Sequence, residues 1–182
     1  MTAADRTLTG GHMLVQNKVV LSLGSNLGDR MENLQEAIDA LFDAPGLTLV
    51  SLSPVYETAP WGGVEQDDFL NVVIVAVTRL TPETLLDRVL SIEESMRRER
   101  IVRWGPRTLD IDIVQFGEIT SDDPDLTLPH PRAHERAFVM VPWAAIDPDG
   151  VLPGHGRVTD LAATLGTEGV NLRGDLTLQR PA

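Results

Sequence analysis

The stretch FLNVVIVAVTRL, from Phe69 to Leu80, runs directly into TPETLLDRVLSIEESMRRER, from Thr81 to Arg100. Its first part is rich in β-branched and apolar residues, which is typical of a buried strand. The second part predicts a helix, because Thr81 suits the N-cap and Pro82 the first helical position. Four apolar residues then recur at helical spacing, at Leu85, Leu86, Val89 and Ile92. A long strand followed at once by a helix is therefore the centre of the predicted fold.

The flanking segments extend this pair to the order strand, helix, strand, strand, helix, strand. KVVLSLG (residues 18–24) predicts a first strand, and a helix from Met31 ends at Pro45 and Gly46. Residues 47–58 are predicted to be mostly extended, and LDIDIVQFG (residues 109–117) alternates as a strand does. This order predicts an α+β protein with the ferredoxin-like βαββαβ arrangement, an antiparallel sheet with two helices on one face.

The rest of the chain predicts a C-terminal extension and a leader. A short strand, a loop and a helix from about Ala133 are expected first, and the tail from Gly150 adds a short helix near residues 159–165. Residues 1–17 lack the apolar core of a signal peptide, so we expect a disordered leader there. No repeat or linker divides residues 18–182, which we expect to form a single domain.

Composition excludes several classes of function. The 182 residues carry a net charge of −12, which argues against a nucleic-acid partner, because such proteins usually bind through a basic face. No apolar run is long enough to cross a membrane, so we expect no membrane partner. The chain has no cysteine, which excludes disulfides and thiolate metal sites. We expect a cytoplasmic protein that acts as a monomer on small molecules.

The positive charge is concentrated in one short segment. Five of the 15 lysines and arginines fall between Arg97 and Arg107. Such a cluster suits a small polyanion, because the planar guanidinium group binds phosphate oxygens through two hydrogen bonds. A solvated, charged helix end is the alternative interpretation.

Two aspartates follow this cluster at alternate positions of a predicted strand. Asp110 and Asp112 should share one face, about 7 Å apart, while Leu109, Ile111 and Ile113 occupy the other. A carboxylate pair of this kind suits Mg²⁺, which keeps water and substrate phosphates as further ligands. An acidic but inert sheet face is the alternative. Arginines and paired carboxylates together match the needs of Mg²⁺-bound ATP.

Other nucleotide signals are weak or absent. Neither GxxxxGK[ST] nor GxGxxG occurs, so ATP would have to bind on a different scaffold. GSNLGDR (residues 24–30) precedes a predicted helix and has two interpretations. Its backbone could approach an anion, or it could be a tight turn in which Asp29 caps the helix.

Four blocks occur in a characteristic order: SLGSNLGDR, SPVYETAPWGGVEQDDFLN, RWGPRTLDIDI and LTLPHPRAHERAF. Together they resemble the 6-hydroxymethyl-7,8-dihydropterin pyrophosphokinases of folate biosynthesis, over roughly residues 19–148. The resemblance implies the ferredoxin-like fold and the transfer of diphosphate from ATP to the pterin hydroxymethyl group, which leaves AMP. It also implies two Mg²⁺ ions.

The resemblance assigns roles to residues of this chain. Asp110 and Asp112 would bind the metal ions. The implied catalytic residues are Arg98, Arg100, Arg103, Arg107, Asp110 and Asp112. The implied ATP-binding residues are Glu93, Arg98, Arg103, Trp104, Arg107, Ile113, His130 and Arg136. The implied pterin-binding residues are Thr58, Ala59, Trp61, Phe69, Asn71, Trp104 and Phe138, with Phe69 and Phe138 stacking on the two faces of the ring.

Two other functions are compatible with the fold. A regulatory ferredoxin-like module would bind a nucleotide or metabolite without turnover, but it would not need the arginines and the aspartate pair together. An ordinary kinase would move only the γ-phosphate of ATP. The residues alone do not separate one-phosphate from two-phosphate transfer, and only the family resemblance does.

Overall fold

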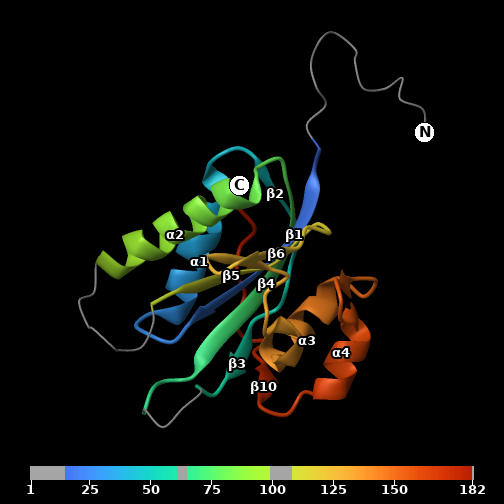
Figure 1. Ribbon diagram of the computed structural model, residues 1–182. Coiled ribbons are helices and arrows are strands. Elements are labelled where there is room, and N and C mark those ends of the chain that lie inside the picture. The colour runs from blue at the N-terminus through green and yellow to red at the C-terminus, as the bar shows by residue number, and fades with distance from the viewer. Residues whose placement is uncertain (1–14, 61–64, 99–107, 182) are drawn as a thin grey trace.

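The computed structural model describes residues 15–60, 65–98 and 108–181 (Figure 1). The elements that build the main sheet and its first helices are β1 (Asn17–Ser25), α1 (Arg30–Asp43), β2 (Leu47–Leu52), β3 (Tyr56–Thr58), β4 (Phe69–Thr78), α2 (Pro82–Arg98) and β5 (Asp110–Phe116). The C-terminal part adds β6 (Ser121–Asp123), β7 (Leu126–Leu128), η2 (Ala133–Glu135), α3 (Ala137–Ile146), β8 (Val151–Leu152), β9 (Gly156–Arg157), α4 (Val158–Leu165) and β10 (Val170–Leu172).

The main sheet has β1 and β4 at its centre. Its strands lie in the order β10, β3, β4, β1, β5, and β2 also pairs with β4. All these pairings are antiparallel, with Leu21 opposite Ile74 of β4 and Leu23 opposite Ile111 of β5. This arrangement confirms the predicted ferredoxin-like α+β fold.

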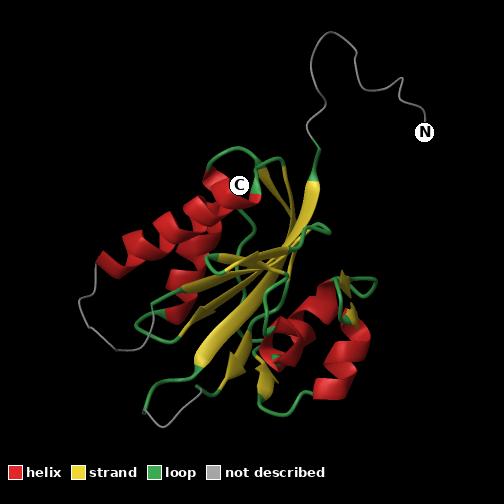
Figure 2. Cartoon of the chain, in the orientation of Figure 1, coloured by secondary structure: helices red, strands yellow, loops and turns green. Residues whose placement is uncertain are grey.

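The two faces of the sheet are covered by different helices (Figures 1 and 2). Helices α1 and α2 lie on one side and pack on alternate strand residues such as Leu21, Ile74 and Ile111. Helices α3 and α4 lie on the other side and pack on residues of the opposite phase, such as Val20 and Val73. Each central strand is therefore buried on both faces, as its continuous apolar sequence predicts.

The second face of the sheet, the one that α3 and α4 cover, changes from apolar to polar along its length. On β1 the residues that point to it run from the buried Val20 through Ser22 to Gly24. The corresponding residues of β5 are Asp110 and Asp112, opposite Gly24 and Ser22. Side chains at alternate positions of a strand share a face, so the apolar end packs under α3 and the polar end stays open.

The start signals of the two long helices are used as the sequence predicts. Asp29 Oδ1 accepts a hydrogen bond from the Glu32 backbone N–H at 3.0 Å, so the capping interpretation of GSNLGDR is confirmed. Thr81 Oγ1 accepts one from the Thr84 N–H at 3.2 Å, ahead of α2. Each bond satisfies a backbone donor that lacks a partner within its helix.

The C-terminal part differs from the prediction in detail. The single short strand expected before the loop is the β6–β7 hairpin. The helix expected from about Ala133 is a 3₁₀ turn over Ala133–Glu135, followed by α3 from Ala137. The extended backbone of Arg136 separates the two. Strand β10 pairs with β3 and was not predicted.

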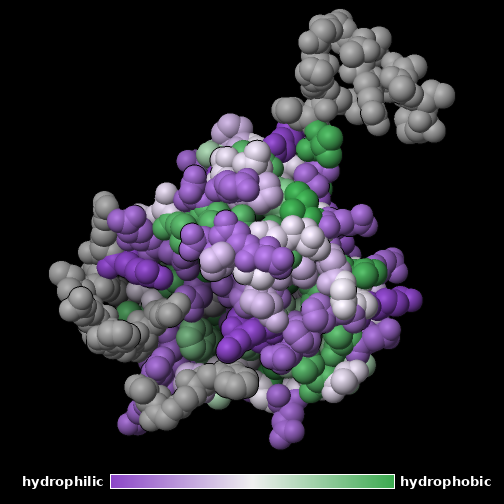
Figure 3. Space-filling view, in the orientation of Figure 1, coloured by the Kyte–Doolittle hydropathy of each residue, from purple (hydrophilic) through white to green (hydrophobic). Residues whose placement is uncertain are grey.

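Within the described ranges, no helix is both long and apolar enough to cross a bilayer. The exposed large apolar residues are spread over separate parts of the chain, and Figure 3 shows hydrophobic residues interspersed with hydrophilic ones on the face it draws. The division into a leader of residues 1–17 and one domain of residues 18–182 stays a prediction. Residues 1–14 lie outside the described ranges, and Asn17 already belongs to β1.

Two leucines of α2 provide a matched test of the core. Leu85 is fully buried against the sheet, whereas Leu90 is 50% exposed. We expect Leu85→Ala to lower the free energy of unfolding by about 2–5 kcal/mol, because it leaves a cavity. Leu90→Ala makes the same change in the same helix and should cost less than about 0.5 kcal/mol. Urea denaturation of both variants measures this difference, and equal losses would contradict the packing described here.

Candidate active site

A cavity of about 570 Å³ opens at the polar end of the sheet's second face, between the strands and α3. Its volume lies within the range of roughly 300–1,000 Å³ that is usual for small-molecule sites. The cavity is lined by Ser22, Gly24, Thr58, Ala59, Gln66, Phe69, Asn71, Asp110, Asp112, Arg132, Glu135, Arg136 and Phe138. Residues from β1, β3, β4, β5 and α3 thus converge on one space, with aromatic rings and carboxylates both present.

The two aspartates lie on one strand face, as the alternation predicts. Asp110 and Asp112 both line the cavity, while Ile111 and Ile113 are buried in the core on the other face. Across the sheet, Asp110 is opposite Gly24 and Asp112 is opposite Ser22. Glycine and serine are small, so the carboxylates stand beside open space instead of packed side chains.

Arg136 and His130, from the C-terminal part of the chain, face Asp112. Arg136 Nη1 lies 3.6 Å from Asp112 Oδ2, and His130 Nε2 lies 4.0 Å from Oδ1. The His130 ring is oriented by the backbone, because its Nδ1 accepts a hydrogen bond from the Arg132 N–H at 3.2 Å. The backbone N–H of His130 donates a hydrogen bond to the Val114 carbonyl at 2.8 Å, which fixes this loop to β5. These contacts place Nε2 on the cavity side of the ring.

The electrostatic environment favours neutral His130. Burial lowers the pKa of its imidazole below the ordinary value of 6.5, and the positive charges of Arg136 and Arg132 act in the same direction. The negative charge of Asp112 opposes them. Since Nδ1 accepts a backbone hydrogen bond, the proton of the neutral ring is on Nε2, where it can be donated to an anionic ligand.

Glu93 supports the carboxylate strand from α2. Its Oε2 accepts a hydrogen bond from the Ile111 N–H at 3.1 Å. Burial raises the pKa of this half-buried carboxyl, the Ile111 hydrogen bond lowers it, and the charge of Asp110 raises it further. Glu93 therefore anchors the outer edge of β5 between the two aspartates.

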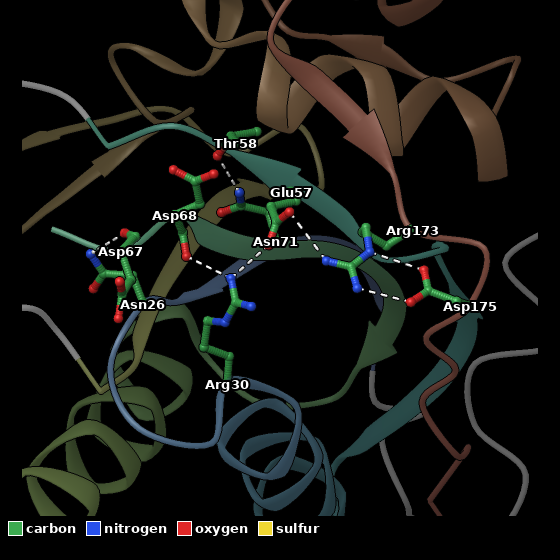
Figure 4. A network of polar contacts seen from close by, with 9 residues as sticks. All are labelled: Asn26, Arg30, Glu57, Thr58, Asp67, Asp68, Asn71, Arg173 and Asp175. Carbon is green, nitrogen blue, oxygen red and sulfur yellow. Dashed lines mark hydrogen bonds and ion pairs between the residues drawn. The ribbon is translucent and has the colours of Figure 1, made fainter.

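The other end of the cavity suits a flat heterocycle. Phe69 and Phe138 line it from β4 and α3, and the Arg136 guanidinium lies 5.6 Å from the centre of the Phe138 ring. Buried Asn71 donates a hydrogen bond from Nδ2 to Thr58 Oγ1 at 2.7 Å (Figure 4). This bond orients the amide, whose oxygen remains available as an acceptor.

Gly24 keeps the space in front of this amide open. A Cβ atom at position 24 would lie only 2.8 Å from Asn71 Oδ1 and 3.5 Å from Phe69 Cδ1. A residue with a Cβ atom would therefore displace the Asn71 side chain, while its contact with Phe69 would be an ordinary van der Waals one. The glycine of the SLGSN block is therefore required by the shape of the cavity.

The residues present fit a hydrated magnesium ion better than a fully protein-bound metal. Within the described part of the chain, no group of three or more His, Cys, Asp and Glu side chains could hold a metal ion. Asp110 and Asp112 supply two carboxylates on one side of an open cavity. Mg²⁺ commonly binds through one or two carboxylates and completes its coordination with water and substrate phosphates.

The predicted site residues divide into three groups. Thr58, Ala59, Phe69, Asn71, Asp110, Asp112, Arg136 and Phe138 line the cavity. Glu93 and His130 lie beside it, and Ile113 has its side chain in the core, which leaves only its backbone to meet a nucleotide. Trp61, Arg100, Arg103, Trp104 and Arg107 lie outside the described residues, as does the side chain of Arg98, the last residue of α2.

The structure adds cavity residues that the sequence analysis missed. They are Ser22, Gly24, Gln66, Arg132 and Glu135. Ser22 could have been found from strand alternation, because it lies two residues before Gly24 on the polar side of β1. Gln66, Arg132 and Glu135 lie in loops or a single 3₁₀ turn, where no periodic pattern indicates which way a side chain points.

Comparison with known proteins identifies a family. The family model of 7,8-dihydro-6-hydroxymethylpterin-pyrophosphokinase (HPPK) matches residues 20–148. A Mycobacterium tuberculosis protein named 2-amino-4-hydroxy-6-hydroxymethyldihydropteridine pyrophosphokinase is 45% identical over 161 residues, 81% of this chain and 84% of that protein. A Pseudomonas aeruginosa protein of the same name is 42% identical over 153 residues, 84% of this chain and 94% of its own length.

A solved structure supports the fold. The HPPK-DHPS protein of Plasmodium falciparum, a triple mutant with pteroate, matches 87% of this chain with a TM-score of 0.67 and 16% sequence identity. This chain spans 47% of that longer chain. At this level of identity the likeness concerns the arrangement of the backbone alone.

The lowered pKa of His130 predicts a measurable titration. In the metal-free protein we expect the His130 ring to titrate below 6.5, because burial and two arginines disfavour its protonated form. Below pH 6.5 the unfolded chain then binds this proton more readily, so His130 reduces the stability of the fold as the pH falls. NMR titration of the ring protons measures the midpoint. Asp112→Asn should lower it further, and a midpoint at or above 6.5 in the wild type would contradict the environment described.

Proposed function

The chain belongs to the 7,8-dihydro-6-hydroxymethylpterin-pyrophosphokinase family, and we propose that it transfers a diphosphoryl group from ATP to 6-hydroxymethyl-7,8-dihydropterin in folate biosynthesis. The products are AMP and the pterin diphosphate. The observation that supports this function best is that one cavity combines aromatic rings and an amide at one end with paired carboxylates at the other. These are the groups that a flat heterocycle and a metal-bound polyphosphate require.

The pterin is proposed to bind at the aromatic end. Phe69 and Phe138 would stack on its two faces, and Asn71 would hydrogen-bond its ring edge. Thr58 orients the Asn71 amide through the hydrogen bond between them, and Ala59 lines the same wall of the cavity. Trp61 and Trp104 are proposed to complete this end of the site. The hydroxymethyl group would then extend toward Asp110 and Asp112.

The polyphosphate is proposed to bind at the carboxylate end. Asp110 and Asp112 would hold two Mg²⁺ ions, which neutralise charge on the phosphate oxygens when bound. Arg136 and the Nε2–H of His130 lie beside Asp112 and would donate to the phosphate oxygens. Glu93 and Ile113 are proposed to contact the nucleotide part. Four arginines are proposed to close on the phosphates: Arg98, Arg100, Arg103 and Arg107. Each guanidinium group can bind more than one phosphate oxygen at once.

The reaction is an in-line displacement at the β-phosphorus of ATP. The pterin hydroxymethyl oxygen forms a bond to this phosphorus, the bond from the β-phosphorus to the α–β bridging oxygen breaks, and AMP leaves with that oxygen. The hydroxyl proton passes to solvent. The chain contributes mainly position and charge, because phosphoryl transfer asks for little covalent chemistry from the protein. We further propose that the protein acts as a monomer in the cytoplasm, where ATP is available.

Nucleotide product analysis tests this function. We expect AMP, and no ADP, when the protein is mixed with ATP, Mg²⁺ and 6-hydroxymethyl-7,8-dihydropterin, because the β-phosphorus is attacked. Omitting the pterin should abolish AMP formation. ADP that depends on the pterin would contradict diphosphoryl transfer and indicate an ordinary kinase. A folded protein that forms neither product would indicate a binding module.

Removing either carboxylate tests the metal assignment. We expect Asp110→Asn or Asp112→Asn to lower turnover by about 100-fold or more at saturating Mg²⁺, because charge on the phosphates loses its counter-ion. Pterin affinity and the melting temperature should stay near the wild-type values. Asp122→Asn, on the exposed β6–β7 hairpin, is the matched control and should retain full activity. Near-normal turnover in both site variants would refute the assignment.

A further inference from the structure

Glu57 of β3 lies between two arginines from distant parts of the chain (Figure 4). Its Oε2 accepts a hydrogen bond from Arg30 Nη1 at 2.7 Å, and its Oε1 accepts one from Arg173 Nη1 at 3.1 Å. The hydrogen bond and charge of Arg30, followed by the charge of Arg173, hold the pKa of this carboxyl below its usual value. Less than a third of each of these three side chains is exposed.

Arg30 connects this carboxylate to the strand that carries the pterin end of the cavity. The same Nη1 that binds Glu57 also donates to the Asp68 carbonyl at 2.9 Å. Asp68 immediately precedes Phe69, and Glu57 immediately precedes Thr58, the hydrogen-bond partner of Asn71. The Glu57–Arg30 pair therefore joins the two backbone segments that carry Thr58 and Phe69 at the aromatic end.

The turn before α1 also holds residues 66–68, the segment that leads into β4, at a second point. Asn26 Nδ2 donates to Gln66 Oε1 at 3.0 Å and to the Asp67 carbonyl at 3.1 Å. Gln66 itself lines the cavity. The GSNLGDR block therefore fixes residues 66–68 through Asn26 and Arg30, a role that its sequence did not indicate.

Arg173, the first residue of the C-terminal tail (residues 173–181), is held by hydrogen bonds to Val55 and Asp175. Its backbone N–H donates to the Val55 carbonyl at 2.8 Å, directly after β10 has paired with β3. Its guanidinium binds Asp175 through two bonds, from Nε at 2.9 Å and from Nη2 at 2.8 Å. A bidentate pair fixes the plane of the guanidinium, which leaves Nη1 directed at Glu57.

The remainder of the tail is anchored on α1 and the core. Leu176 and Leu178 pack against the core cluster beneath α1 and α2. Gln179 and Gln35 exchange two hydrogen bonds, at 2.8 Å from the Gln179 N–H and 3.0 Å to its carbonyl. The tail is thus attached to α1 and the core, and its first residue, Arg173, contacts Glu57 next to the pterin end of the cavity.

We propose that the C-terminal tail is a positioning element of the pterin end of the cavity, and that Arg173 exerts this effect through Glu57 and Arg30. The identity of the ligand in this inference rests on the proposed function. Without Arg173, Glu57 keeps one partner and gains freedom to rotate, so Arg30 holds the Asp68 carbonyl less firmly. Phe69 and Thr58 then sample more positions. The carboxylate end is built from β5 and from His130 and Arg136, which precede α3, so it should not respond.

The test compares four proteins: wild type, Arg173→Gln, Arg173→Lys and Arg180→Gln. Arg180 is the matched control, because it belongs to the same tail but makes a single 3.4 Å hydrogen bond, to the Val50 carbonyl. Calorimetry measures the affinity for the pterin with a non-hydrolysable ATP analogue and Mg²⁺, and the affinity for the analogue alone. Hydrogen exchange of ligand-free protein reports the mobility of residues 57–58 and 68–71.

We expect Arg173→Gln to weaken pterin binding about fivefold, the upper range for a partly exposed ion-pair network, and to leave analogue affinity within about twofold. Turnover at saturating pterin should be retained while KM for the pterin rises. Lysine should restore part of the loss, because it keeps a charge near Glu57, and Arg180→Gln should match the wild type. Exchange at residues 57–58 and 68–71 should be fastest in the Arg173→Gln protein, raised to a smaller extent in Arg173→Lys, and unchanged in Arg180→Gln.

Two results would overturn the inference. One is unchanged exchange and pterin affinity in Arg173→Gln. The other is an equal loss in Arg180→Gln, which would indicate general loosening of the tail. If wild-type protein binds no pterin, the proposed function fails, and the exchange data then decide the positioning role by themselves. If Arg173→Gln does not fold, the lysine variant carries the same comparison, because it too lacks the bidentate bond to Asp175.

Discussion

The antiparallel pairing of β1 with β4 on one side and β5 on the other is the constraint on which the rest of the structure depends. It aligns Gly24 with both Asn71 and Asp110, so the groups proposed to bind the pterin and the metal meet across one strand. A slip of one residue would turn every side chain to the opposite face. The aspartates would then be buried among the core residues of α1 and α2, at a large cost in desolvation.

One sheet face serves two purposes because its composition changes along the strands. Val20, Val73 and the buried Trp143 form the apolar half with α3 and α4. At the other half small residues, Ser22 and Gly24, leave a cavity between the sheet and the first turn of α3. Helix α3 thus packs the core with one end and places Arg136 and Phe138 at the cavity with the other. Stability and site geometry therefore depend on the same contacts.

Much of the fold and part of the site could be predicted from local patterns. The alternation of LDIDI places Asp110 and Asp112 together without knowledge of any distant contact, and Pro82 marks the start of α2. Strand β10 and the Glu57 contact with Arg173 could not be predicted in this way, because the two residues lie 116 positions apart. A strand of only three residues, such as Val170–Leu172, has too short a pattern to indicate its partner. The direction of Gln66 and Glu135 likewise depends on loop geometry that no periodicity encodes.

The central claim is that one cavity holds the pterin between Phe69 and Phe138 and the metal-bound polyphosphate on Asp110 and Asp112. A crystal structure of the protein with 6-hydroxymethyl-7,8-dihydropterin, a non-hydrolysable ATP analogue and Mg²⁺ tests it most directly. We expect the pterin ring to be stacked between the two phenylalanines and Mg²⁺ to be coordinated by both aspartates. The hydroxymethyl oxygen should lie in line with the β-phosphorus. A pterin bound elsewhere, or metal ions without contact to either aspartate, would contradict it.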